Sequence, residues 1–301
     1  MKVLLTGSTG FLGRNILNVL KEQEYQIVTL GNPSTDIVCD ISKEVPAFSH
    51  AFNYVIHAAG KAHVVPKSDS EKQDFHDVNV KGTQNLLEGL KKSNFLPQYF
   101  IFISSVSVYG LDSGMKIDES YPLLAKDPYG ISKINAEKIV QDWCNENKIK
   151  CTILRLPLLV GTNPPGNLGA MSNAIKKGYY FNIGGGEAKK SMVLAEDVAR
   201  FITYVAKIGG VYHLTDGIDP DFKELSLAIA KNNKKSAPLN MPIIVAKLLG
   251  KCGDIIGNKA PINSLKVAKI CSELTFDDSK AKSINEWNPQ SVLEYLKKEK
   301  I

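Results

Sequence analysis

Tyr129 and Lys133, four residues apart, are the pair in this sequence best suited to chemistry. On a helix such a pair shares one face, so the ammonium can stabilise the phenolate and lower a tyrosine pKa that is ordinarily about 10. A tyrosine of lowered pKa can move a proton on and off an alcohol. The pair opens an expected helix, and a serine-bearing strand end, residues 104–110, lies just upstream.

A glycine loop stands at the start of the chain, where Gly7, Gly10 and Gly13 separate an apolar run from an amphipathic one. The first glycine permits a tight turn, the second lets the backbone approach a pyrophosphate, and the third lets the helix pack on the strand. The helix amino terminus adds amide donors. The loop predicts dinucleotide binding, with one more residue between the first two glycines than in the common GxGxxG spacing.

The sequence leaves open whether the cofactor is NAD or its 2′-phosphorylated form, NADP. The second strand ends in Leu30-Gly31-Asn32, without the carboxylate that normally binds the ribose hydroxyls of NAD. NADP is therefore allowed as well as NAD, and the sequence does not show whether Asp36 reaches back to take the missing place. Asp40 and Ile41, after a short third strand, are expected to meet the adenine edge.

Alternating strands and helices must position these groups. β-Branched runs are expected as strands and amphipathic runs as helices, which predicts an α/β fold: a Rossmann-like doubly wound parallel sheet covered on both faces. A smaller mixed α/β substrate-binding domain completes it. The expected strands are 2–6, 26–30, 54–58, 99–104, 151–156 and 210–214, and the expected helices are 11–23, 78–92, 129–146, 195–205 and 293–300. The cofactor domain is expected over 1–160 plus about 190–214, and the substrate domain over about 161–189 plus 215–301.

Composition excludes several classes. The chain has 301 residues, 44% of them hydrophobic, and a net charge of +6, so it can bury a large core. Its basic residues include only three arginines, with no basic stripe of the kind that binds nucleic acid. The apolar runs fall short of the ~18 residues that a membrane span needs. Five widely spaced cysteines favour a reducing compartment and no metal site. A cytoplasmic protein without nucleic-acid or membrane partners is expected.

Several motifs, taken in order, resemble the extended short-chain dehydrogenase/reductases of the NAD-dependent epimerase/dehydratase family, which act on nucleotide sugars. The resemblance runs through nearly the whole chain and implies an enzyme with NAD or NADP, a nucleotide-diphosphate sugar as substrate, and no metal. It leaves a homodimer open. The motifs are Thr6–Gly13, His57–Gly60, Asn79–Thr83, Ser105–Gly110, Tyr129–Lys133, Asp278–Ala281 and Trp287–Pro289.

The resemblance also implies roles for individual residues. Tyr129 would transfer the proton, Lys133 would lower its pKa and hold the nicotinamide ribose, and Ser105 would hydrogen-bond the reacting sugar oxygen. Apart from the resemblance, His57 is expected to be a buried, hydrogen-bonded imidazole and His63 a surface or loop residue, neither of them catalytic. The further cofactor-binding residues implied are Gly7, Thr9, Gly10, Phe11, Leu12, Gly13, Asp40, Ile41, Ala58, Ala59, Gly60, Asn79 and Pro157, and substrate contacts are expected from Asn167, Leu168 and Lys190.

Departures from the family pattern narrow the reaction. Val106 and Ser107 follow Ser105 where 4,6-dehydratases carry an Asp-Glu pair, and Val106 also stands where 3,5-epimerase/reductases carry a cysteine. Oxidation and reduction at C4 of the sugar remain. The first choice is a UDP-sugar 4-epimerase; the alternative is an NAD(P)H-dependent reductase of 4-keto-6-deoxy sugars. A non-catalytic dinucleotide sensor is a remote third, because such proteins lose the tyrosine or the lysine.

Overall fold

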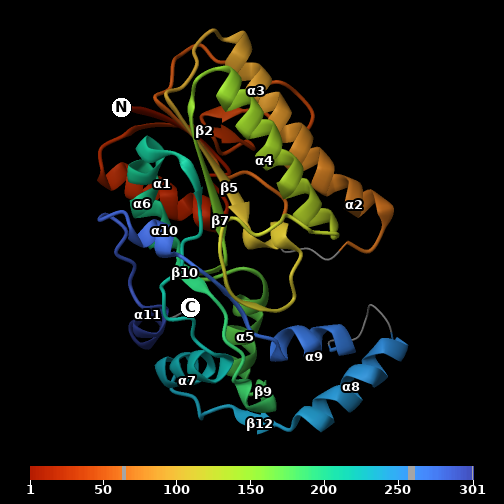
Figure 1. Cartoon of the computed structure of the whole chain (residues 1–301). Coiled ribbons are helices and arrows are strands. Elements are labelled where there is room, and N and C mark those ends of the chain that lie inside the picture. The colour runs from red at the N-terminus through yellow and green to blue at the C-terminus, as the bar shows by residue number, and fades with distance from the viewer. Residues whose placement is uncertain (63–65, 257–261, 300) are drawn as a thin grey trace.

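The structure, a computed structural model, describes residues 1–62, 66–256, 262–299 and 301. A parallel seven-stranded sheet of order β11-β7-β5-β4-β1-β2-β3 forms its upper half in Figure 1. The strand order reverses between β1 and β4, which is where such sheets bind ligands, at the carboxyl ends of the strands. The strands are β1 Lys2–Thr6, β2 Gln26–Gly31, β3 Ile37–Val38, β4 Tyr54–His57, β5 Tyr99–Ser105, β7 Lys150–Leu156 and β11 Gly210–Tyr212.

Helices cover both faces of this sheet, because successive strand side chains point to opposite sides. Val3 and Leu5 join one core with helices α1 and α6, and Leu4 joins the other core with α3 and α4. Figure 1 shows α1 and α6 together on one side and α2, α3 and α4 on the other. The bounds are α1 Phe11–Glu22, α2 Asp69–His76, α3 Gly82–Lys92, α4 Pro128–Glu146 and α6 Ala195–Ile208.

The lower half of the molecule holds three two-stranded parallel sheets and most of the remaining helices (Figure 1). Its core gathers Leu168 and Met171 with residues of α7 and α11. The paired strands are β8 Leu158–Val160 with β10 Met192–Leu194, β9 Phe181–Ile183 with β12 Leu239–Met241, and β6 Gly114–Ile117 with β13 Leu274–Phe276. The helices are α5 Gly166–Lys177, α7 Phe222–Asn232, α8 Ile243–Ile256, α9 Ser264–Cys271, α10 Ser279–Lys282 and α11 Val292–Lys298.

The structure confirms the expected fold class, and the strand expected over 210–214 does return to the main sheet, where β11 pairs with β7. One helix is longer than expected. Helix α2 begins at Asp69 and continues through a π-helical turn, Asp77–Lys81, into α3. Its sequence is polar and buries only Phe75, so apolar periodicity gives little sign of it. Ser68 caps it by accepting a hydrogen bond from the Glu71 amide.

Candidate active site

The glycine loop after β1 forms a tight cradle that leaves no room for side chains. Gly7 has a φ of +72°, and a Cβ there would lie 2.6 Å from the Ala58 carbonyl carbon and the Ala59 amide nitrogen. A Cβ on Gly13 would lie 1.9 Å from the Gly7 oxygen. Helix α1 starts directly behind the loop, and no side chain caps its amino terminus. The loop therefore presents backbone amides and a helix end, which suit a phosphate.

Two residues expected at the cofactor or the substrate have buried side chains. Leu12 and Leu168 are 7% and 2% exposed and belong to hydrophobic cores. Phe11 differs, because its ring is only partly buried and lies beside Gly161, where a Cβ would be 3.1 Å from the ring.

Tyr129 and Ser105 meet above the carboxyl end of β5. Ser105 ends that strand, and Tyr129 is the second residue of α4. Burial raises the pKa of the Tyr129 phenol, a hydrogen bond with Ser105 lowers it, and the charge of Asp127 raises it. The Phe75 ring packs against the Tyr129 ring, 6.0 Å between centroids, and contributes to that burial. The structure thus brings together the two groups expected to share the reacting oxygen.

Lys133 lies one turn further along α4, where its side chain is buried. The Lys133 Nζ donates a hydrogen bond to the Ile103 carbonyl at 2.8 Å and lies 4.7 Å from the centre of the Phe102 ring. Burial lowers the pKa of Lys133 to about 8. In this arrangement the ammonium is committed to a backbone carbonyl, and its effect on the pKa of Tyr129 stays a prediction.

Asn79 joins three elements at the same edge of the sheet. It lies in the π-helical turn, a type of distortion frequent at functional sites. Its Nδ2 donates to the Ser132 hydroxyl at 2.8 Å and to the Lys61 carbonyl, and its Oδ1 accepts from the Lys61 amide at 2.7 Å. A Cβ on Gly60 would lie 3.1 Å from Asn79 Oδ1 and 3.3 Å from Lys133 Nζ. Asn79, Gly60 and Lys133 thus border one space.

The carboxylate of Asp36 is directed at strand β2. Its Oδ2 accepts hydrogen bonds from the amide and the hydroxyl of Thr29, at 2.8 and 2.7 Å, and these lower its pKa. The carboxylate therefore hydrogen-bonds the strand at Thr29, two residues before the strand ends at Gly31. Asp40 is exposed and paired with Lys43 at 2.9 Å, and Ile41 next to it is buried.

His57 is a structural residue, as expected. Its ring lies between the hydroxyls of Thr6 and Thr83, with Nδ1 and Nε2 at 2.7 and 3.0 Å from them. Burial, with a smaller effect of the Lys133 charge, lowers the pKa of His57 to about 3, so the ring is neutral at physiological pH. It links β1, β4 and α3 behind the site. His63 lies outside the described residues.

A buried ionic network around Glu137 of α4 is not foreseen from the sequence. Glu137, one turn after Lys133, accepts from Arg155 Nη2 at 2.8 Å and from the Ser104 hydroxyl at 2.5 Å. Arg155 also donates to the Tyr109 hydroxyl at 3.0 Å, and that hydroxyl lies 2.6 Å from His213 Nε2. Glu137 sits at i+4 from Lys133 on the same helix face, which is the one signal that could have found it.

Pro157, expected at the cofactor, joins β7 to β8. Of the expected substrate contacts, Asn167 is exposed in the first turn of α5. Lys190 is half-buried, and its backbone forms a bridge with Leu274. Burial lowers the pKa of Lys190, while the charges of Asp112 and Lys269 act on it in opposite directions.

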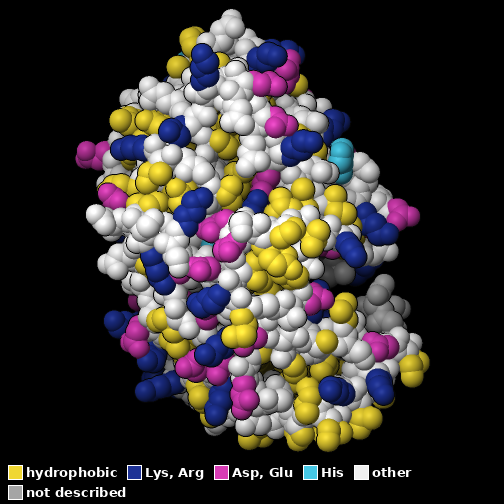
Figure 2. Space-filling view, viewed as in Figure 1, with side chains coloured by type: hydrophobic (Ala, Val, Ile, Leu, Met, Phe, Trp, Pro, Cys, Tyr) yellow, Lys and Arg dark blue, Asp and Glu magenta, His cyan; other side chains and the backbone are white. Residues whose placement is uncertain are grey.

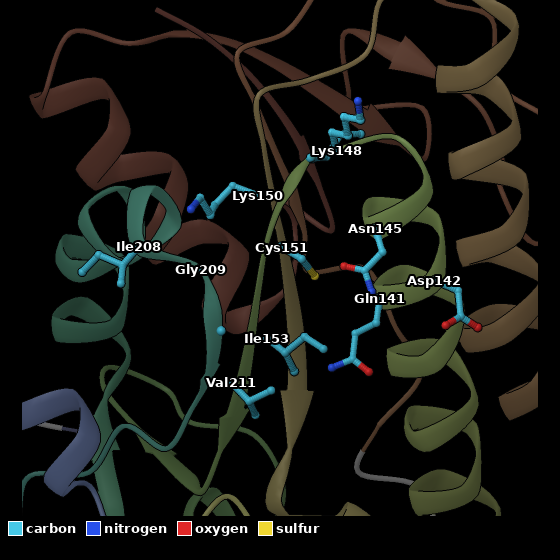
Figure 3. A pocket seen from close by; sticks show the side chains of 12 residues that line it. Gln141, Asp142, Asn145, Lys148, Lys150, Cys151, Ile153, Ile208, Gly209 and Val211 are labelled. Atoms are coloured by element: carbon cyan, nitrogen blue, oxygen red, sulfur yellow. The ribbon is translucent and has the colours of Figure 1, made fainter.

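A cavity of about 680 Å³ lies at the other end of the main sheet (Figure 3). It is lined by the last turns of α4, by Lys150 and Cys151 at the start of β7, and by Gly209 and Val211. Its lining reaches Ile153, three residues, or roughly 10 Å, before Leu156, which pairs with Ser105 at the carboxyl end of β7.

Comparison with known proteins places these features in context. Residues 3–213 match the model of a family described as the NAD dependent epimerase/dehydratase family. The N-acetyl-alpha-D-glucosaminyl-diphospho-ditrans,octacis-undecaprenol 4-epimerase of Escherichia coli O157:H7 is 29% identical, over 93% of this chain and 88% of that protein. The UDP-glucose 4-epimerase of Vibrio cholerae is 28% identical, over 97% and 92%.

The fold has a close counterpart among solved structures. The UDP-glucuronic acid 4-epimerase of Bacillus cereus, solved in complex with NAD, superimposes with a TM-score of 0.75. The match covers 99% of this chain and 95% of that one at 19% identity. At that identity the likeness concerns the fold.

Proposed function

The chain belongs to the NAD-dependent epimerase/dehydratase family, and from that premise we propose that it is a 4-epimerase of a UDP-sugar. The observation that carries the proposal is the meeting of Tyr129 with Ser105 at the edge of the sheet where the glycine loop also lies. The relatives of Escherichia coli and Vibrio cholerae, matched over 88% and 92% of their length, are named 4-epimerases. NAD or NADP is the cofactor.

The residues present fit a dinucleotide. Gly7 and Gly13 keep the loop free of side chains, and the uncapped start of α1 offers amides to a diphosphate. Gly60, Asn79 and Lys133 border the space in which we place the nicotinamide ribose. NAD, when bound, supplies the acceptor for the C4 hydride and returns it.

The chain's own residues handle the proton. Tyr129 takes the proton of the sugar 4-hydroxyl as the C4 carbonyl forms, and returns it when the hydroxyl re-forms. Ser105 hydrogen-bonds the same oxygen and keeps it next to the phenol. Because the Ser105 hydroxyl also accepts from the Ser107 amide at 3.2 Å, its position is fixed by the turn that follows β5.

The diphosphate of the substrate is proposed to lie near Asn167 and Lys190, on the lower half of the molecule. The half-buried Lys190 provides a positive charge without the forked geometry of an arginine. The name of the Escherichia coli relative carries a polyprenol in place of a nucleoside on the diphosphate. A sugar carried on a lipid diphosphate is therefore the second candidate substrate. A cytoplasmic location belongs to the same proposal and is favoured by five free cysteines.

One experiment separates epimerisation from the alternative of reduction. The purified chain is incubated with UDP-glucose or UDP-N-acetylglucosamine and catalytic NAD, with no reductant added, and the sugar configuration is followed by proton NMR. We expect interconversion at C4 without net change in NADH absorbance. Stoichiometric NADPH oxidation that occurs only with a 4-keto-6-deoxy sugar would establish the reductase instead.

A second experiment distinguishes the two candidate carriers of the sugar, UDP and a polyprenyl diphosphate. The same assay is repeated with N-acetylglucosamine on a polyprenyl diphosphate in detergent. Turnover of the UDP-sugars alone supports the first candidate, and turnover of the lipid-linked sugar alone supports the second. A chain that turns over neither, while a thermal-shift assay shows that it binds NAD, would exclude both substrates.

A further inference from the structure

Helix α8 exposes large aliphatic side chains to an unusual degree. Ile244, Leu248 and Ile255 are 70%, 60% and 89% exposed, and Val245 and Leu249 are also exposed. We call these five residues the α8 face. Figure 1 places α8 at the lower edge of the molecule, far from the main sheet, and Figure 2 shows hydrophobic side chains along that edge with lysines among them.

Helix α8 buries small residues and exposes large aliphatic ones, the opposite of an ordinary amphipathic helix. Its buried positions are Ala246, Gly250 and Gly253, which recur at the spacing of one helical face. Gly250 packs closely on the start of α9, where a Cβ would lie 3.1 Å from the Ser264 amide nitrogen. At 100° per residue, Ile244, Leu248 and Ile255 fall directly opposite this stripe of small residues. The helix thus packs on the protein through small residues and presents its aliphatic ridge outward.

The α8 face has apolar neighbours on adjoining elements. Leu239 of β12, immediately before α8, is 70% exposed, and Leu265 of α9 is 58% exposed. An exposed apolar area that extends over several elements is the mark of an interaction surface.

The charge of the whole chain is concentrated in the same segment. Residues 231–272 contain eight lysines and a single acidic residue, whereas the rest of the chain has 29 basic and 30 acidic side chains. That acidic residue, Asp254, accepts a hydrogen bond from the Ser264 amide at 3.0 Å. Lys247 and Lys251 flank the aliphatic ridge and make no ion pair within the part of the chain that the structure describes. The segment therefore combines exposed aliphatic side chains with a sequence excess of seven positive charges, eight lysines against one acidic residue.

We propose that the α8 face and its flanking lysines dock the protein on the surface of an anionic phospholipid bilayer. A helix with an aliphatic outer ridge and lysines beside it lies in the plane of the membrane interface, with its apolar side chains among the upper acyl chains and its ammonium groups at the lipid phosphates. A polypeptide partner would need a groove that is apolar along the aliphatic ridge and acidic beside the lysines. An anionic bilayer offers acyl chains and phosphates over its whole surface. The proposal stands on the surface alone and does not depend on the proposed function.

The docking surface does not require a spanning helix, and none of the helices in the described ranges is long and apolar enough to cross a membrane. The sequence led to the expectation of no membrane partner, on the ground that its apolar runs are too short to span a bilayer, and the proposed docking surface departs from that expectation. The docking surface is also linked to the site. Helix α9 packs against α8 and ends at Cys271, three residues before Leu274, whose backbone forms a bridge with Lys190. A docked bilayer would therefore adjoin the end of the molecule where we place the substrate diphosphate.

The test is co-sedimentation of the full chain with vesicles. Vesicles of phosphatidylcholine with added phosphatidylglycerol are compared with vesicles of phosphatidylcholine alone, at low and at high salt. We expect binding to the anionic vesicles that weakens with salt, because the lysine contribution is screened. Leu248→Gln should weaken binding roughly tenfold, and Lys247→Gln with Lys251→Gln should weaken it roughly tenfold or more.

Helix α6 supplies matched controls. Ile208→Gln and Lys207→Gln replace an exposed aliphatic residue and an exposed lysine on the other half of the molecule, and should leave vesicle binding unchanged. A chain that does not sediment with anionic vesicles overturns the proposal. So does a loss in the α6 variants equal to that in the α8 variants, with all variants melting within a few degrees of the parent.

A second copy of the chain is the competing occupant of the α8 face. Light scattering after gel filtration distinguishes a second copy of the chain from a bilayer as the occupant of the α8 face. If Leu248→Gln converts a dimer into a monomer and leaves vesicle binding intact, the α8 face is a subunit interface and the proposal is wrong. A mass that Leu248→Gln does not change, together with lost vesicle binding, supports the proposal.

Discussion

The ammonium of Lys133 hydrogen-bonds the carbonyl of Ile103 at 2.8 Å, which ties helix α4 to strand β5 beneath the catalytic candidates. The lysine is 6% exposed, and burial lowers its pKa to about 8. Because the charged form is penalised by burial, the cofactor-free protein gives up stability in order to keep a cation at this place. A functional group held at such a cost is typical of an active site.

Replacing Lys133 by Met is expected to stabilise the cofactor-free protein while abolishing turnover. The folded-state pKa lies below that of the unfolded chain, so the unfolded chain binds the proton more tightly between pH of about 8 and 10.5. The loss of stability caused by burying the charged lysine is complete below about pH 8. It disappears as the pH rises towards the pKa of Lys133 in the unfolded chain. Urea unfolding at neutral pH should show a gain of about 1–3 kcal/mol for Lys133→Met. A difference that does not shrink at alkaline pH would contradict this account.

Replacing Tyr129 by Phe removes the proposed proton carrier and little else. We expect kcat to fall by about 10²–10⁴-fold, with NAD affinity and melting temperature close to those of the parent. Steady-state epimerisation and NAD titration provide the measurements. Tyr204→Phe, at an exposed position of α6, is the matched control and should keep full activity. Full turnover by Tyr129→Phe would remove the tyrosine from the mechanism.

Breaking the buried pair of Arg155 and Glu137 should cost far more than breaking an exposed one. Arg155→Met leaves the Glu137 carboxylate without its bidentate partner and should lower the free energy of unfolding by about 3–5 kcal/mol. Arg200→Met, which breaks an exposed pair with Glu196, should cost less than about 1 kcal/mol. Urea denaturation compares the two. Adding Glu137→Leu to Arg155→Met should recover part of the loss, and a further loss would mean that the pair itself is not the cause.

The glycine loop predicts a ranking of NAD affinities. Gly13→Ala puts a methyl group 1.9 Å from the Gly7 oxygen, so the helix must move away from the loop. Gly10→Ala is milder, because its Cβ would lie 3.2 Å from the same oxygen and its φ of −73° suits alanine. Isothermal titration with NAD should show binding lost in Gly13→Ala and only weakened in Gly10→Ala. The reverse order would mean that the loop does not close as the structure has it.

The sequence by itself determined the features that are local. Strand and helix periodicity predicts the parallel sheet, and the spacing of Gly7, Gly10 and Gly13 between a strand and a helix predicts the loop, because both patterns act within one or two neighbouring elements. The order of Ser105, Tyr129 and Lys133 identifies the candidate active site, because these residues lie at the end of one strand and in the helix that follows it. The roles of these residues follow from family resemblance.

Only the tertiary structure decided what lies between elements far apart in the chain. Asn79 meets Ser132 across 53 residues, and the bond of Lys133 to Ile103 depends on how closely α4 packs on β5. Helix α8 is the clearest case. Its sequence is apolar around most of its circumference, so no pattern shows which face meets the protein. Because the hydrophobic effect has no direction of its own, the close approach of α9 at Gly250 fixed that face and left Ile244, Leu248 and Ile255 outside.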